Sequence, residues 1–164
     1  MKKKKYFNVI NPFNGEIVGE SPNNSKKEIN NILNDAAHYK CELSGIERSE
    51  ILNKNIQTIQ KNKRVLSKLI SLESGLCIKN ALYEVERAIN CIHYCSLQAK
   101  LIDNIDITSE YLDKKDSGNP KLKVYSEPLN LVIGITPFNH PLNMVMHKVG
   151  PAIAAGAPII IKPS

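Results

Sequence analysis

The stretch LVIGITPFNHPLNMVMHKVGPAIAAGAPIIIKPS, residues 131–164, decides the fold class. Residues 131–135 form a continuous apolar run that predicts a buried strand, and residues 159–161 predict a second, fully buried strand. Between them apolar side chains recur at helical spacing, at Leu142, Val145, Met146, Val149 and Ile153. A strand, a crossover helix and a strand within about 35 residues predict a βαβ unit of a parallel sheet.

The ends of this predicted helix carry their own signals. Gly156 suits the C-terminus of a helix, and Pro158 suits the first position of a strand. Pro151 lies inside the helical pattern and has no backbone N–H, so it predicts a kink or a local break.

Each predicted strand of the unit ends in a short motif, ITPFN after the first and KPS after the second. In open α/β sheets, ligands bind just beyond the carboxyl ends of the strands. In a right-handed βαβ unit both ends face the same edge of the sheet. The sequence therefore predicts a site where one ligand touches both motifs.

Two residues at these strand ends have functional chemistry. Asn139 offers neutral N–H donors, and Pro137 and Pro141 restrict the backbone around it, which suits the stabilisation of a developing oxyanion. The alternative is a turn asparagine that bonds its own backbone. Lys162 is a lone cation that can bind a ribose hydroxyl or a phosphate, and its alternative is an ordinary strand exit into solvent.

The first part of the chain predicts a short hairpin and then a helix. Residues 8–22 alternate around turn residues and predict two short strands. Ser25 and Glu28 have capping-box spacing, which predicts a helix start. The apolar side chains of this helix fall on one face, which we expect to be a core face; they are Ile29, Ile32, Leu33, Ala36 and Ala37.

Two further helical patterns follow. One begins near Glu47, is interrupted around Lys61, and resumes up to a stop at Gly75. The next runs from Ile78 to about Leu101, and its stripe is most simply a core face. Residues 108–127 then alternate around a Gly-Asn-Pro turn and predict a hairpin that is polar on both sides. A lone hairpin is marginal, so it needs another surface to pack on.

Composition limits the class of protein. The chain has 164 residues, of which 42% are apolar and 23% charged, as in a soluble globular domain. No apolar run approaches the ~20 residues of a membrane span, and the basic start MKKKKYFN lacks the apolar core of a signal peptide, so we expect a cytoplasmic protein. The net charge of +6 lies in a lysine tail and scattered surface lysines, with no Trp and three Phe, so we expect no nucleic-acid partner.

Four cysteines are present, at Cys41, Cys77, Cys91 and Cys95. In the segment CIHYC, Cys91 and Cys95 share a helix face but His93 points elsewhere. Zinc sites need four ligands at recognised spacings, so we expect no metal site here.

The segments EPLNLVIGITPFNHPLN and HKVGPAIAAGAPIIIKPS together resemble the NAD(P)-dependent aldehyde dehydrogenase superfamily. NPFNGE resembles the family's early Asn-Pro-x-x-Gly-Glu turn, and ESGLCIKNALYEVERA resembles its Glu-Thr-Gly-Lys-Pro…Glu-Val stretch. The resemblance covers nearly the whole chain, in the family's order. It implies an incomplete aldehyde dehydrogenase fold of the α/β class: N-terminal helices and the first βαβ unit of a Rossmann-like parallel sheet, with a protruding β-hairpin.

The resemblance also implies roles for the strand-end residues. Family members use a cysteine thiolate to attack an aldehyde and pass a hydride to NAD or NADP. Asn139 matches the asparagine that hydrogen-bonds the oxyanion, and Lys162 matches the lysine that contacts the adenosine ribose. The strand end that lines the dinucleotide matches Ile135, Thr136, Pro137 and Phe138. Phe138 departs from the tryptophan of many members, and His140, where an aromatic is common, is expected to be an exposed turn histidine.

The family's domain plan implies a partial dinucleotide-binding domain at 1–107 and 128–164, and part of an oligomerisation hairpin at 108–127. The implied partners are a small aldehyde, either lactaldehyde-like or a phosphorylated or phosphono-aldehyde, and further copies in a homo-oligomer. The nucleophilic cysteine and the general-base glutamate are not matched before Ser164, so we expect the catalytic domain to be absent and the chain alone to be inactive. The alternative is a non-catalytic truncated chain that pairs with full-length subunits through its hairpin.

Overall fold

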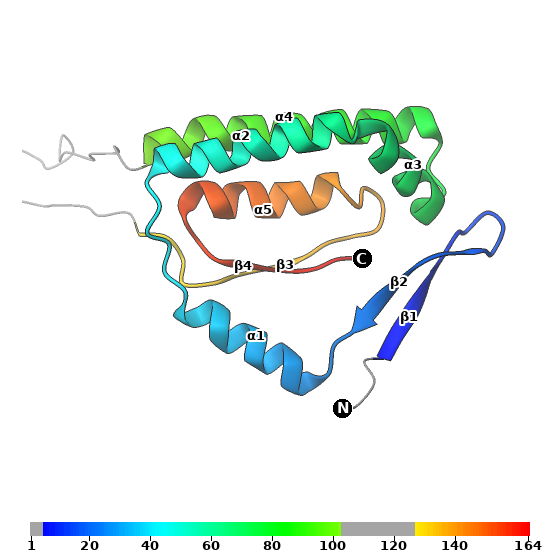
Figure 1. Ribbon diagram of the computed structural model, residues 1–164, viewed down its shortest axis with the longest axis horizontal. Coiled ribbons are helices and arrows are strands. Elements are labelled where there is room, and N and C mark those ends of the chain that lie inside the picture. The colour runs from blue at the N-terminus through cyan, green and yellow to red at the C-terminus, as the bar shows by residue number, and fades with distance from the viewer. Residues whose placement is uncertain (1–4, 103–126) are drawn as a thin grey trace, which may run out of the picture.

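A computed structural model of the chain describes residues 5–102 and 127–164, so the hairpin predicted at 108–127 lies outside the described residues apart from its last position. Figure 1 shows the arrangement of the elements. In chain order they are β1 (Lys5–Ile10), β2 (Ile17–Asn23), α1 (Lys26–His38), α2 (Gly45–Lys61), α3 (Lys63–Ser74), α4 (Ile78–Ile102), β3 (Val132–Ile135), α5 (Asn143–Ala155) and β4 (Ile159–Lys162).

The predicted βαβ unit is confirmed. β3 and β4 pair in parallel, with Val132 opposite Ile159 and Ile135 opposite Lys162. α5 makes the crossover between them and ends at Gly156, which has a left-handed φ of 78°. A kink or a local break was expected at Pro151, and of these the break does not occur, because α5 continues through Pro151 to Ala155.

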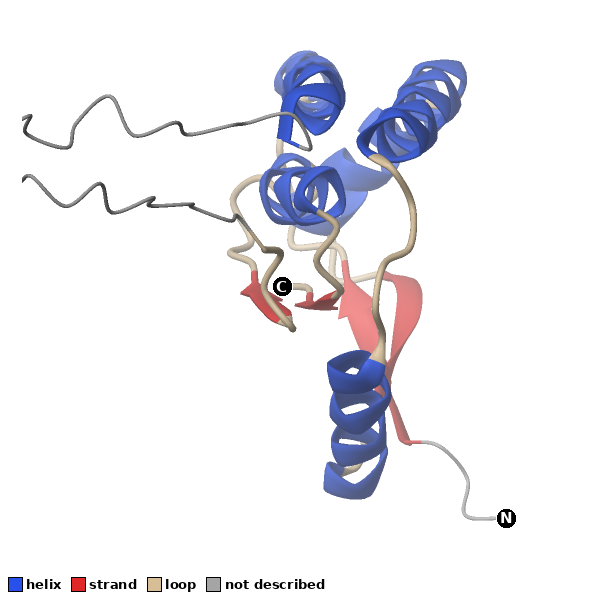
Figure 2. Cartoon of the chain, turned by 90° about the vertical axis from the view of Figure 1, so that its left-hand side faces the viewer, coloured by secondary structure: helices blue, strands red, loops and turns tan. Residues whose placement is uncertain are grey.

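α5 forms the middle layer of the molecule. Figures 1 and 2 place it between the layer of α2 and α4 and the strands β3 and β4, with α1 on the far side of the strands. Small residues allow this close packing. A Cβ on Gly134 would lie 2.5 Å from Cδ1 of Ile161, and a Cβ on Gly150 would lie 2.9 Å from Sγ of Cys95. A side chain at position 134 would therefore displace the Ile161 side chain on β4 and press on Lys148 of α5, whose Cβ would lie 3.3 Å away, and one at position 150 would displace the Cys95 side chain on α4.

The core is built around α4. Its inward stripe is almost completely buried and consists of Ala81, Val85, Ala88, Ile92 and Ala99. Leu52 and Ile59 of α2 and Ile70 of α3 join the same cluster, as does Ala154 of α5. The core-face prediction for α4, which packs against α2, α3 and α5, is thus confirmed for Val85, Ile92 and Ala99. It is wrong for Ile78 at the start of the helix, which is exposed.

Local signals set most helix boundaries as expected. The capping box at α1 is present, because the Glu28 N–H donates to Oγ of Ser25 (3.3 Å) and the Ser25 N–H donates to Glu28 (2.8 Å). Ser44 and Glu47 form a second capping box at α2, which the sequence analysis overlooked although the spacing is the same. The break near Lys61 separates α2 from α3.

Three expectations about burial are wrong. β3 is not a buried strand: Ile133 and Ile135, which lie on the face opposite Gly134, are 58% and 69% exposed. β4 is only half-buried along residues 159–161. The reason is that α5 covers one face of this two-stranded sheet, whereas α1 on the far side contacts β4 and leaves Ile133 and Ile135 of β3 exposed. The apolar stripe of α1 likewise buries none of its residues.

Within residues 5–102 and 127–164, no helix has the length and apolar character that a membrane span requires.

Candidate functional site

The carboxyl ends of β3 and β4 lie side by side, as the two strand-end motifs predict. Ile135 is directly opposite Lys162 in the parallel register. The ladder continues one residue further, since the Thr136 N–H donates to the Lys162 carbonyl at 3.2 Å. We call residues 135–139 together with Lys162 the strand-end edge. A single ligand at this edge is within reach of both motifs.

The side chains at the strand-end edge are mostly available to a ligand. Ile135 is 69% exposed and Phe138 is 78% exposed. Asn139 and Lys162 are also exposed, whereas Thr136 is buried and fixes the start of the loop. The edge therefore combines apolar surface, a neutral amide and one cation, which is the chemistry that a flat heteroaromatic ligand with a polyhydroxyl or phosphate group would require.

The Asn139 amide makes no hydrogen bond within the described part of the chain. Two other asparagines show the contrast. Oδ1 of Asn11 accepts the Phe13 N–H at 3.0 Å, and Oδ1 of Asn14 accepts the Glu16 N–H at 3.1 Å. Both are turn asparagines that bond the nearby backbone. Asn139 does not behave in this way, so its two N–H donors remain open to solvent or to a ligand.

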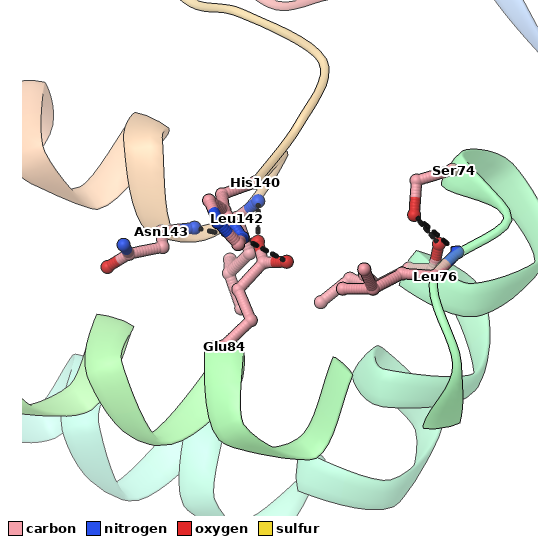
Figure 3. A network of polar contacts seen from close by, with 7 residues as sticks. Ser74, Leu76, Glu84, His140, Leu142 and Asn143 are labelled. Carbon is pink, nitrogen blue, oxygen red and sulfur yellow. Dashed lines mark hydrogen bonds and ion pairs between the residues drawn. The ribbon is translucent and has the colours of Figure 1, made fainter. Parts of the chain in front are cut away.

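A residue that the sequence analysis missed secures the far end of the loop. Glu84, on α4, is 1% exposed. Its Oε1 accepts the N–H groups of Leu142 (2.8 Å) and Asn143 (3.1 Å) at the start of α5. Figure 3 shows Glu84 reaching from α4 to this turn. A charged residue inside the apolar stripe of a long helix was the available signal, since an unpaired charge is rarely buried.

His140 is exposed, as expected for a turn histidine. Its Nδ1 nevertheless lies 3.5 Å from Oε2 of Glu84, the second oxygen of the same carboxyl group. Oε2 is buried and accepts no hydrogen bond within the described residues. The two oxygens of Glu84 therefore face two parts of one turn, His140 on one side and the N–H groups of Leu142 and Asn143 on the other (Figure 3).

Cys91 and Cys95 do not resemble activated nucleophiles. Burial, and then the neighbouring Cys91 thiol, raise the pKa of Cys95 to about 11. Burial also raises the pKa of Cys91. A nucleophilic cysteine instead needs a lowered pKa or an adjacent base. Among residues 5–102 and 127–164, no three His, Cys, Asp or Glu side chains are gathered as a metal site would require.

The raised pKa of Cys95 leads to a prediction about alkylation. Because only the thiolate reacts, we expect iodoacetamide to modify exposed Cys77 well before Cys95 at pH 8. The rate at Cys95 should rise about tenfold for each pH unit up to pH 10, still below its pKa of about 11. Peptide mapping by mass spectrometry measures both rates in one sample. A Cys95 rate that levels off near pH 9 would contradict the raised pKa.

A cavity of about 250 Å³ lies away from the strand-end edge, where α5 ends and β4 begins. Its lining is mainly apolar and comprises Tyr39, Cys41, Leu43, Arg48, Ile51, Ile153, Gly156, Ala157, Pro158 and Ile159. The Arg48 guanidinium already donates from Nε to the Ala154 carbonyl at 3.0 Å and to the Leu43 carbonyl. The cavity shares no residue with the strand-end edge and adds no charged group that is open to a ligand.

Comparison with known proteins covers the whole chain. The family model described as "Aldehyde dehydrogenase family" matches residues 1–164. The lactaldehyde dehydrogenase of Methanococcus aeolicus is 34% identical over 164 residues, which are 98% of this chain and 34% of that protein. Aspartate-semialdehyde dehydrogenase 1 of Pseudomonas canavaninivorans is 33% identical over 97% of this chain and 34% of its own length.

Solved structures agree with the sequence comparison. The crystal structure of a glyceraldehyde-3-phosphate dehydrogenase from Methanocaldococcus jannaschii, complexed with NADP, superposes with a TM-score of 0.83 at 32% identity. The match covers 100% of this chain and 35% of that one. The chain thus spans about a third of the length of the relatives it matches.

Proposed function

The chain belongs to the aldehyde dehydrogenase family, and from this premise we propose that it supplies the oxyanion donor and part of the cofactor wall of an enzyme that oxidises a small aldehyde with NAD or NADP. The observation that carries the proposal is the Asn139 amide. It stands exposed at the strand-end edge, makes no hydrogen bond within the described residues, and has Lys162 on the adjacent strand.

The residues of the strand-end edge fit a nicotinamide dinucleotide. Exposed Ile135 and Phe138 offer apolar surface for a flat ring, and Lys162 offers a cation for a ribose hydroxyl or a phosphate. Thr136 and Pro137 complete the backbone of this wall. When bound, the cofactor accepts the hydride that leaves the aldehyde carbon. A relative that is complexed with NADP supports a nicotinamide dinucleotide as the ligand.

In this proposal Asn139 acts on the charge that develops during thiolate attack. Addition of a thiolate to the aldehyde carbon places negative charge on the carbonyl oxygen. A neutral amide fixed beside that oxygen stabilises the charge without itself changing protonation. The raised pKa values of Cys91 and Cys95 support a nucleophile that comes from another part of the enzyme.

The finer assignments follow from the same family plan. We propose that residues 1–107 and 128–164 are part of a dinucleotide-binding domain, and that residues 108–127 contribute to the contact between subunits of a homo-oligomer. The relatives are named for lactaldehyde, aspartate semialdehyde and glyceraldehyde 3-phosphate. These names support a small oxidised or phosphorylated aldehyde as the substrate.

A chimaera tests the proposed function. Residues 1–164 replace the corresponding third of the Methanococcus aeolicus lactaldehyde dehydrogenase, whose remaining two thirds supply the missing groups. We expect formation of reduced cofactor from lactaldehyde, followed by absorbance. The same assay on residues 1–164 alone, and on the remaining two thirds alone, should give no product.

Two results would count against the proposal. A folded chimaera that binds NADP but forms no product with any small aldehyde would mean that the strand-end edge does not serve this reaction. Clear turnover by residues 1–164 alone would mean that the nucleophile lies within this chain.

A further inference from the structure

We propose that Glu84 is the positioning residue for Asn139: from α4 it holds the start of α5 and thereby keeps the Asn139 amide at the strand-end edge. The proposal rests on the function proposed above for Asn139. Its structural basis is independent of that function, because the contacts of Glu84 lie entirely within the described residues.

The start of α5 has no cap of its own. The first N–H groups of a helix have no partner within the helix and need one from elsewhere. At α1 and α2 a serine side chain meets this need, but the N-cap of α5 is Leu142, which has no side-chain acceptor. Glu84 takes that place from 58 residues away and accepts the N–H groups of both Leu142 and Asn143.

The loop that carries Asn139 is consequently fixed at both ends. At one end, Thr136 continues the ladder with Lys162 on β4. At the other, Leu142 is bound to Glu84 on α4. Asn139 lies three residues from each anchor, and the prolines at 137 and 141 remove further backbone freedom. Loss of Glu84 would remove the anchor to α4 and leave this end of the loop with only the local bond from the Met144 N–H to the His140 carbonyl (3.0 Å).

The burial of Glu84 also indicates a specific role. A carboxyl group in the apolar stripe of α4 loses its hydration, and this costs free energy unless hydrogen bonds replace the water. The two N–H groups provide those bonds, and the positive end of the α5 dipole favours a negative group there. The second oxygen faces His140, the residue after Asn139, at 3.5 Å. All three contacts of this carboxyl group therefore fall within four residues of Asn139.

The test uses residues 1–164 and three variants. Glu84→Ala removes the acceptor. Glu84→Gln keeps a carbonyl oxygen where Oε1 now accepts both N–H groups, so it should rescue the contact without the charge. Glu86→Ala is the matched control, because Glu86 lies on the same helix but is exposed and paired with Lys63.

The measured quantity is the backbone order of Asn139 from ¹⁵N relaxation. We expect an order parameter near ~0.85 in the parent chain, Glu84→Gln and Glu86→Ala, and below ~0.6 in Glu84→Ala. The amides of the α4 core, such as that of Ile92, should keep their order in all four proteins. If Glu84 had only a general structural role, Glu84→Ala would lower the order parameters of the core amides together with that of Asn139. Glu84→Gln would then not restore the order of Asn139 selectively.

Several results would overturn the proposal. The first is that the Asn139 order parameter stays high in Glu84→Ala. The second is that it falls as far in Glu86→Ala as in Glu84→Ala. If Glu84→Ala does not fold, amide exchange in the parent chain decides instead. We expect the Leu142 and Asn143 amides to exchange at least ~10-fold more slowly than in an unfolded chain, because each donates to Glu84. Exchange at the unfolded rate would overturn the proposal.

A second arm uses the chimaera and separates this proposal from the proposed function. Glu84→Ala should lower kcat by up to ~10²-fold through misplacement of Asn139, with little change in KM, and Glu84→Gln should recover most of it. In a chimaera that already carries Asn139→Ala, adding Glu84→Ala should lower kcat almost no further. An inactive chimaera would count against the proposed function and leave the relaxation result on residues 1–164 standing. Additive losses in an active chimaera would overturn the positioning role.

Discussion

Alanine at position 139 is expected to lower kcat of the chimaera by about 10²–10³-fold, because one fixed donor to a developing oxyanion typically contributes that much. The cofactor KM should change little, since the amide acts on the charge that forms in the transition state and leaves the cofactor wall in place. Steady-state kinetics with lactaldehyde, at saturating and limiting NADP, measure both constants.

The matched control for this variant is Asn14→Ala. Asn14 is also an exposed loop asparagine, but its amide and carbonyl groups are both used within the β1–β2 turn, where they bond Glu16. This variant should retain the parent kcat. A parent-like kcat in both variants would remove Asn139 from the proposed site. An equal loss of kcat in both would point to a general effect on folding.

Ile92→Ala is expected to lower the free energy of unfolding of residues 1–164 by about 2–5 kcal/mol. Ile92 is 1% exposed and lies at the centre of the stripe with which α4 contacts its neighbours, so its loss removes apolar burial and leaves a cavity. Urea unfolding followed by circular dichroism should show a lower midpoint with an unchanged slope.

Ile78→Ala is the comparison for this stability measurement. It makes the same change of side chain in the same helix, but Ile78 is exposed. An exposed substitution should shift the free energy of unfolding by no more than about 0.5 kcal/mol. Similar shifts for the two variants would mean that the α4 stripe is not the core of the isolated chain.

Local patterns predicted most of the elements that build the fold. The βαβ unit follows from two apolar runs around a helical stripe, and helix ends follow from Ser25 with Glu28 and from Gly156. These signals act over a few residues, so they are readable without tertiary information. The sequence also predicted that the two strand-end motifs lie side by side, since parallel strands in one crossover unit end at the same edge of the sheet.

Burial and long-range contacts were not predictable in the same way. A continuous apolar run predicts a strand, but it does not indicate which face of that strand other residues of the chain cover. For this reason the exposure of Ile133 and Ile135 was not predicted. Glu84 was missed because its partners lie 58 and 59 residues away and are backbone N–H groups, which carry no side-chain signal. For Asn139 the sequence left two interpretations open, and only the structure shows that its amide does not bond its own turn.

The open sheet has a consequence for experiments in solution. Within the described residues, β3 and β4 pair only with each other, so each strand has an outer edge with unpaired N–H and carbonyl groups. Such an edge beside exposed Ile133 and Ile135 is a template on which a strand from another copy can pair. Self-association of this kind couples folding to mass action, so the unfolding midpoint of residues 1–164 should be compared at several protein concentrations.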